Sequence, residues 1–260
     1  MQNLEFLHFV VWNRDMWYNG RNGSGNGLMA GRRKWMNQPG KANEYVKENC
    51  VVQEELPEFH VAPLIGWMND PNGFSVYQGK VHLFYQYHPY SAQWGPMHWG
   101  HCVTEDFVKW ERLPVALAPD QAYDEAGCFS GSGMETEAGH VLVYTGVRKE
   151  ECDGVQKEYQ NQCIAVGNGR SYKKSEQNPV ITGSMLPEGF SREHFRDPKI
   201  WREPDGYYMA VGNKTNEGIP QVVLFHSEDF SKWNYVSVLA RDQSGKLGMM
   251  WECPDFFCMD

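Results

Sequence analysis

The amino-acid sequence predicts an all-β protein of the β-propeller class, and three observations lead to this prediction. The chain of 260 residues contains 14% aromatic residues and 26 glycines, a composition typical of short strands joined by tight turns. Short apolar or alternating runs separated by turn residues fill most of the chain. Parts of the sequence also recur at a spacing of roughly 60 residues, which favours propeller blades with insertions over the two packed sheets of a sandwich.

The first predicted elements lie near the N-terminus. Residues 1–40 are rich in Gly and Asn and are expected to form a flexible leader, because such a stretch buries little apolar surface. Residues 41–50 contain good helix formers, with Tyr45 and Val46 on one side, and predict a short helix. Residues 41–260 are assigned to a single propeller domain.

Two sequence signals recur and define the repeating unit. Asp70-Pro71 returns as Asp197-Pro198, and each pair precedes a predicted hairpin. The string Glu105-Asp106-Phe107-Val108-Lys109-Trp110 returns as Glu228-Asp229-Phe230-Ser231-Lys232-Trp233. Each unit therefore begins with Asp-Pro, runs through a hairpin, and closes with an Asp-Phe-x-Lys-Trp turn and a further strand.

The remaining elements follow from these repeats. A more diverged set of strands lies between the two copies, from Phe129-Ser130-Gly131 to about Ile181. A fourth unit is predicted to open at Glu252-Cys253-Pro254. The chain thus accounts for about three blades plus the start of a fourth. Asp70, Asp197 and Glu252 begin equivalent units, and the first strand of a blade is normally the innermost, so we expect these acids to converge on one end of the central channel.

A cluster of three carboxylates indicates chemistry. Packing like charges together costs free energy and raises some of their pKa values, which a stable core does not require. Glycoside hydrolysis does require it, because one carboxylate attacks the anomeric carbon and a second protonates the leaving oxygen. An isolated Asp before Pro is also a common turn starter. Here Trp67 lies close before the first acid, while Arg196 adjoins the second and Trp251 the third, and aromatic faces with a few polar groups suit a sugar pocket.

Four segments resemble the signature motifs of glycoside hydrolase family 32, the invertases and sucrose-6-phosphate hydrolases. In chain order they are Trp67-Met68-Asn69-Asp70-Pro71-Asn72-Gly73, Phe129-Ser130-Gly131, Phe195-Arg196-Asp197-Pro198 and Trp251-Glu252-Cys253-Pro254-Asp255. The first and last are highly specific, and the resemblance covers roughly residues 41–260. It implies a five-bladed β-propeller normally followed by a β-sandwich, so we expect the propeller to be incomplete on its C-terminal side and the sandwich to be absent.

The resemblance also implies an activity and a set of site residues. The activity is hydrolysis of the terminal β-D-fructofuranoside bond of sucrose or sucrose 6-phosphate by a retaining double displacement. Asp70 would be the nucleophile and Glu252 the acid/base, while Asp197 would hold fructose hydroxyls and stabilise the transition state. Arg196 is expected to help keep Asp197 ionised, as an adjacent cation does. The residues expected to bind the substrate are Trp67, Met68, Asn69, Gln86, Trp94, Phe129, Ser130 and Arg196.

Several alternatives stay open at this point. The chain could be a catalytically incomplete fragment or a carbohydrate-binding remnant of such an enzyme, because it stops soon after Glu252. It could also come from a related five-bladed propeller enzyme, such as a fructosyltransferase or an arabinanase. The choice among sucrose, sucrose 6-phosphate and short fructans is open, and so is the oligomeric state.

Composition and charge restrict the partners. A net charge of −9 argues against a nucleic acid or an anionic membrane surface, and no apolar stretch has the length of a membrane span. The expected partner is a small sugar, without a cofactor. Seven cysteines without CxxC spacing favour reduced thiols in the cytoplasm over a disulfide framework. No metal site is expected, since His98 and His101 lack the carboxylate spacing of a zinc helix.

Overall fold

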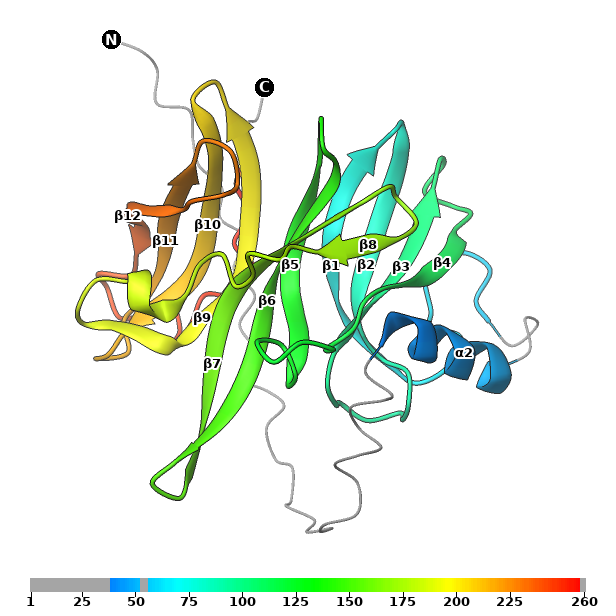
Figure 1. Ribbon diagram of the computed structural model, residues 1–260, viewed down its shortest axis with the longest axis horizontal. Coiled ribbons are helices and arrows are strands. Elements are labelled where there is room, and N and C mark those ends of the chain that lie inside the picture. Colours follow the sequence, from blue (N-terminus) through cyan, green and yellow to red (C-terminus); the bar gives the residue numbers. More distant parts are fainter. Residues whose placement is uncertain (1–37, 52–55, 258–260) are drawn as a thin grey trace.

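The computed structural model describes residues 38–51 and 56–257, in which the predicted short helix and three antiparallel sheets are present (Figure 1). Helix α2 spans Pro39–Asn49 and begins with a proline, which suits the first turn of a helix. Its Ala42 is buried in an apolar cluster with Tyr85 and Tyr87 of the first sheet. Most of the predicted leader, residues 1–40, lies outside the described residues, and its last residues belong to α2.

Each sheet is a four-stranded meander in which every strand pairs with the next in sequence. The first sheet contains β1 (Trp67–Tyr77), β2 (Lys80–His88), β3 (His98–Thr104) and β4 (Glu111–Leu117). The second contains β5 (Gly127–Thr136), β6 (Gly139–Cys152), β7 (Val155–Gly167) and β8 (Tyr172–Lys174), and a short 3-10 helix, η2 (Gly183–Met185), follows it. The third contains β9 (Phe190–Glu203), β10 (Gly206–Thr215), β11 (Pro220–Ser227) and β12 (Asn234–Arg241).

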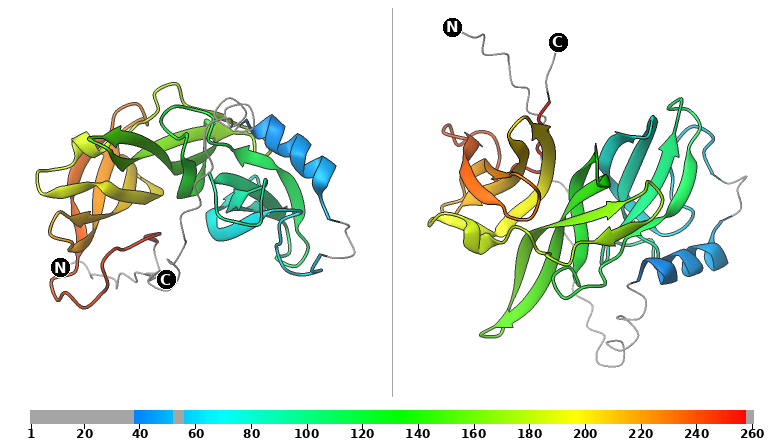
Figure 2. Two further views of the ribbon diagram at one scale, coloured as in Figure 1. Left: turned by 90° about the horizontal axis from the view of Figure 1, so that it is seen from below. Right: turned by 45° about the horizontal axis from the view of Figure 1, so that its top comes forward.

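The three sheets are consecutive blades of a β-propeller. Their first strands are neighbours, because β1 contacts β5 and β5 contacts β9. Figure 2 shows the sheets following one another around an arc. The predicted fourth unit forms no ladder strand within the described residues, but its start lies against the third blade: the Cys253 N–H donates to Oδ2 of Asp197, in β9, at 3.0 Å. The all-β propeller prediction and the order of its units are confirmed.

The innermost strands share an irregularity at one position. In β1, Asn69 and Asp70 together face Gln86 of β2. In β9, Asp197 and Pro198 together face Val211 of β10. The pairing of β5 shifts in the same way around Ser130. These shifts are β-bulges, which re-aim side chains and are common beside active sites.

A recurrent turn joins the third and fourth strands of each blade. In the first blade Asp106 Oδ1 accepts the N–H groups of Val108 and Lys109, and the intervening Phe107 is left-handed with φ 61°. The equivalent Phe230 has φ 69°, so the predicted Asp-Phe repeat is one turn used twice. In the second blade Asn168 takes the place of the aspartate and is followed by Gly169, with φ 83°. Sequence comparison missed this third copy because neither residue is identical.

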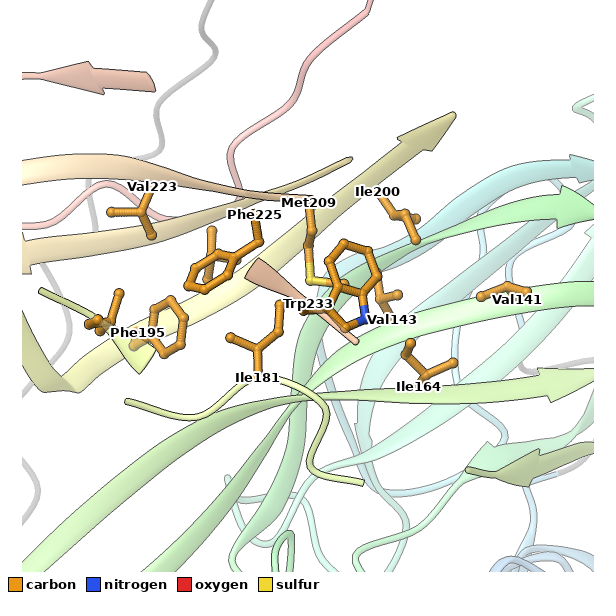
Figure 3. Close-up of a cluster of buried hydrophobic side chains, with 12 residues drawn as sticks. Val141, Val143, Ile164, Ile181, Phe195, Ile200, Met209, Val223, Phe225 and Trp233 are labelled. Carbon is orange, nitrogen blue, oxygen red and sulfur yellow. The ribbon is translucent and has the colours of Figure 1, made fainter. Parts of the chain in front are cut away.

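The main apolar core lies between the second and third blades (Figure 3). Side chains from β6 and β7 meet side chains from β9, β10 and β11 there, together with Trp233, which is 2% exposed. The buried members shown and labelled in Figure 3 are Val141, Val143, Ile164, Ile181, Phe195, Ile200, Met209, Val223, Phe225 and Trp233.

The first and second blades meet through aromatic and histidine rings. His82 and Phe84 of β2 contact the His140 ring of β6, with ring centroids 5.0 and 5.8 Å apart. His140 Nε2 lies 2.8 Å from Ser75 Oγ of β1. Burial lowers the pKa of His140 to about 3, so this ring is neutral at pH 7 and can pack against the aromatic core.

A stability prediction follows from Ser132, which joins the innermost strands β5 and β9. Its Oγ donates to the Pro198 carbonyl at 2.9 Å and accepts the Ile200 N–H at 2.9 Å, both in buried surroundings. Ser132→Ala should lower the free energy of unfolding by about 1–3 kcal/mol, because it leaves a buried carbonyl and a buried N–H unpaired. Urea denaturation checks this. Ser237→Ala on the outer strand β12 serves as the control, and equal losses in the two variants would contradict the prediction.

Candidate active site

The structure gathers the three predicted acids around Asp197. Asp197 is 6% exposed in β9, while Asp70 in β1 and Glu252 after β12 are half-buried. The pKa of Asp197 is raised to about 6, mainly by burial and in smaller part by the charges of Glu252 and Asp70. The Arg196 charge and the Cys253 N–H act in the opposite direction. Acids from three separate units therefore lie close enough for the charges of Asp70 and Glu252 to affect the pKa of Asp197.

Arg196 binds Glu252. Its Nε and Nη2 donate to Glu252 Oε1 at 3.0 and 2.5 Å. Its charge does lower the Asp197 pKa, as the sequence predicted, but burial outweighs it and the net shift is upward. The guanidinium therefore fixes the position of Glu252 more directly than the charge state of Asp197.

The remaining contacts of Arg196 come from residues that sequence reasoning missed. Its Nη1 donates to Gln160 Oε1 and approaches His194 Nδ1, at 3.4 Å in each case. Burial, followed by the charges of Lys214 and Arg196, lowers the pKa of His194 to about 4, so its ring is neutral and can accept this contact. His194 lies two residues before Arg196 on β9. Residues two apart on a strand point to the same face, and this spacing could have indicated that His194 lies beside Arg196.

The backbone brings the segment containing Glu252 unusually close to the third blade. A Cβ on Gly212 would lie 2.4 Å from the Trp251 carbonyl oxygen and 3.1 Å from that of Arg196. Only a residue without a side chain permits this approach. Asp197 and Cys253, which share the hydrogen bond between the two segments, are both left-handed, with φ 63° and 49°.

The predicted residues of β1 divide between two faces. Trp67 Nε1 donates to Asn69 Oδ1 at 2.8 Å, so these two side chains hold each other next to Asp70. Met68 instead packs on the apolar cluster that includes Tyr85 and Ala42. Alternation along a strand explains this difference. Met68 supports the strand from behind.

Gln86 and Ser130 are buried and linked through Asn72, a residue that sequence reasoning did not single out. With its amide oxygen facing Gln86, Asn72 accepts from the Gln86 Nε2 and N–H groups at 2.8 and 3.0 Å, and its amide nitrogen donates to Ser130 Oγ at 3.0 Å. Gln86 Nε2 also donates to the Cys128 carbonyl at 3.0 Å. Because Gln86 and Ser130 are only 3% and 5% exposed, this group joins the first two blades beneath the site.

Trp94 and Phe129, two further predicted residues, form an aromatic pair. Their rings meet edge to face with centroids 6.1 Å apart, and Trp94 is 47% exposed. Within residues 38–51 and 56–257, no group of three or more His, Cys, Asp or Glu side chains is arranged to hold a metal ion. Over the same ranges no helix has the length and apolar character of a membrane span.

The close approach at Gly212 yields a prediction. Gly212→Ala should push the Trp251–Glu252 backbone away from Arg196. The added Cβ would overlap the Trp251 carbonyl oxygen, and a backbone atom cannot move aside as the end of a flexible side chain can. We expect a destabilisation of about 1–3 kcal/mol from this overpacking, measured by thermal unfolding. Gly40→Ala, in α2, adds a Cβ that meets nothing within 4 Å at a position without a left-handed backbone, and is the control for a general effect of losing a glycine. A loss at Gly212 no larger than that at Gly40 would contradict the steric account.

Comparison with known proteins places the chain in a family. The family model described as the glycosyl hydrolases family 32 N-terminal domain matches residues 60–260. A sucrose-6-phosphate hydrolase of Zymomonas mobilis is 43% identical over 227 residues, which cover 84% of this chain and 43% of that protein. A raffinose invertase of Escherichia coli is 42% identical over 205 residues, covering 77% of this chain and 41% of that protein.

Solved structures agree with this result. A family 32 β-fructofuranosidase of Bombyx mori is 40% identical and superposes with a TM-score of 0.74, covering 85% of this chain and 46% of its own. A variant of that enzyme has been solved in complex with sucrose. The present chain thus spans less than half of the length of each of these proteins. With more than three quarters of its residues matched by the family model, the chain belongs to glycosyl hydrolase family 32 and carries the family's N-terminal domain.

Proposed function

We propose that the protein containing this chain hydrolyses the terminal β-D-fructofuranoside bond of sucrose or sucrose 6-phosphate with retention of configuration. The observation that carries this proposal is the convergence of Asp70, Glu252 and the buried Asp197 from separate units of the propeller. Retaining glycosidases need two carboxylates beside the scissile bond, one as nucleophile and one as acid/base. The sucrose-6-phosphate hydrolase and invertase relatives, and the sucrose complex of the Bombyx mori enzyme, support the substrate class.

Asp70 is proposed to attack the anomeric carbon of fructose. It lies at the bulge of β1, where Asn69 and Asp70 together face one residue of β2. Within the described residues its carboxylate accepts no hydrogen bond and has no ion pair, so both oxygens are available to the substrate. Attack forms the fructosyl-enzyme and breaks the bond to the glucosyl oxygen.

Glu252 is proposed to protonate that leaving oxygen and then to remove a proton from the water that cleaves the fructosyl-enzyme. Arg196 makes both of its hydrogen bonds to Oε1. The second oxygen, Oε2, has no partner among the described residues and can therefore face the leaving group. The double contact to one oxygen fixes the carboxylate while leaving the other oxygen for proton transfer.

Asp197 is proposed to hold fructose hydroxyls, with Trp94 and Phe129 against the apolar face of the sugar. Within the described residues this buried carboxylate accepts the Cys253 N–H and has the Cys253 thiol beside it, which is little solvation for a charge. Hydroxyl donors from the sugar would supply the missing hydrogen bonds, and those bonds strengthen as positive charge develops on the ring. The cysteine pattern, an odd number without CxxC spacing, supports a cytoplasmic location as part of the same proposal.

The first test is release of glucose and fructose from sucrose and from sucrose 6-phosphate. Asp70→Asn and Glu252→Gln should each reduce kcat at least about a thousandfold, because each removes a group that takes part in bond making or proton transfer. Glu188→Gln, which changes an exposed acid before β9, should leave kcat unchanged. Full activity in the Asp70→Asn variant would rule out the proposed nucleophile.

Asp197 allows a second test, in which stability and activity move in opposite directions. The folded-state pKa is about 6, above the usual 3.8, so the folded state binds more protons than the unfolded state between those values. The carboxylate therefore makes stability fall as pH rises through this window, and the full loss is present above it. Asp197→Asn should stabilise the protein at pH 7 by on the order of 1–3 kcal/mol, while activity falls sharply.

Thermal unfolding of the wild type and Asp197→Asn at pH 4 and pH 7, beside sucrose hydrolysis, checks this prediction. The stability difference should be largest at pH 7 and close to zero at pH 4. A difference that does not change with pH would show that the carboxylate is not destabilised by burial. Asp205→Asn, at an exposed position in the β9–β10 turn, is the matched control.

A further inference from the structure

We propose that Thr145, oriented by Gln162, is a positioning residue for the reaction: it holds the Asp197 backbone in its left-handed conformation and so places the Asp197 carboxylate among the other acids. The inference rests on the proposed function for its catalytic consequence. Its structural part, that Thr145 fixes the Asp197 backbone, stands on contacts alone. Thr145 acts from β6 of the second blade on β9 of the third.

The Asp197 backbone needs an external constraint. Its φ of 63° is a conformation that residues other than glycine adopt at a cost of order 1–3 kcal/mol and only where the surroundings impose it. The bulge against Val211 also interrupts the β9–β10 ladder, and the following Pro198 has no N–H to offer. The Asp197 N–H therefore has to find its acceptor in another element, since a buried unpaired N–H is costly.

Thr145 supplies that acceptor, and the direction of each hydrogen bond can be assigned. The Asp197 N–H can only donate, so Thr145 Oγ1 accepts it, at 2.9 Å. The hydroxyl proton of Thr145 is then free to donate to Gln162 Oε1, at 2.8 Å. The amide nitrogen of Gln162 donates to the Phe195 carbonyl, at 2.8 Å. One continuous chain of hydrogen bonds thus begins at the Asp197 N–H and ends at the Phe195 carbonyl, on either side of Arg196.

A third side chain completes this clamp. Gln160 Oε1 accepts the Phe195 N–H at 2.9 Å and also receives Arg196 Nη1 at 3.4 Å. Thr145 and Gln162 are fully buried and Gln160 is 4% exposed. Buried polar side chains cost free energy unless every partner is present, and a complete network specifies one conformation. Here the network fixes the two residues that carry the guanidinium of Arg196 and the carboxylate of Asp197.

The test compares two substitutions in the full chain. Thr145→Val keeps the shape but removes the hydroxyl, whereas Thr145→Ser keeps the hydroxyl. We expect Thr145→Val to lower kcat/KM for sucrose by about 10- to 100-fold, since small misplacements of a catalytic group cost such factors. Thr145→Ser should restore activity to within about threefold of the wild type. Thr136→Val, which loses a hydroxyl bonded to the Gly139 carbonyl at 3.0 Å in the β5–β6 hairpin, should leave kcat/KM unchanged.

An activity-independent measurement separates this inference from the proposed function. Hydrogen exchange of the Asp197 amide should speed up at least tenfold in Thr145→Val and stay near the wild-type rate in Thr145→Ser. If the wild type releases no fructose, the proposed function fails, and the exchange rates still decide whether Thr145 fixes Asp197. Unchanged exchange in Thr145→Val, or wild-type kcat/KM in that variant, would overturn the inference. Lost activity in Thr145→Ser that matches the loss in Thr145→Val would overturn it as well.

Discussion

The arrangement of the site depends on a break in the hydrogen-bond ladder of the innermost strands. Pro71 and Pro198 have no N–H, so each belongs at a sheet edge, and the first strand of each blade is such an edge. At both places the strand bulges and the preceding aspartate leaves the ladder. A regular strand would send successive side chains alternately to the two neighbouring blades. The bulge changes the direction of the acidic side chain. The proline prevents the regular ladder from forming at this point, because it has no N–H to donate.

The broken ladder at Asp197 and Pro198 is repaired by the neighbouring blade, so contacts that hold the second and third blades together also build the site. Ser132 of β5 bonds the backbone on the far side of Pro198, while Thr145 of β6 bonds the Asp197 N–H. Gln86 of the first blade reaches the Cys128 carbonyl of the second. These contacts are mostly buried, as is the apolar core around them, but unlike apolar packing they are directional. Changes at blade interfaces should therefore affect site geometry as well as stability.

The sequence was informative wherever a feature depends on local chemistry. The Asp-Pro repeats marked the first strands of two blades and the Asp-Phe repeats marked their turns, because both signals are short residue pairs that repeat along the chain. Features that depend on tertiary contacts could not be read in this way. The choice of Glu252 as the partner of Arg196 requires the close approach at Gly212, and the roles of Thr145 and Gln162 require two blades in register.

The raised pKa of Asp197 follows from the same geometry. Arg196 is its sequence neighbour, yet the guanidinium extends to Glu252 and leaves the buried Asp197 carboxylate with the Cys253 N–H as its hydrogen-bond donor within the described residues. Burial then dominates over the nearby positive charge. A carboxylate held rigidly with few hydrogen-bond donors around it retains oxygen lone pairs that accept no hydrogen bond. Under the proposed function, sugar hydroxyls complete its hydrogen bonds, so the free-energy cost of burying this carboxylate is offset most strongly in the charged transition state.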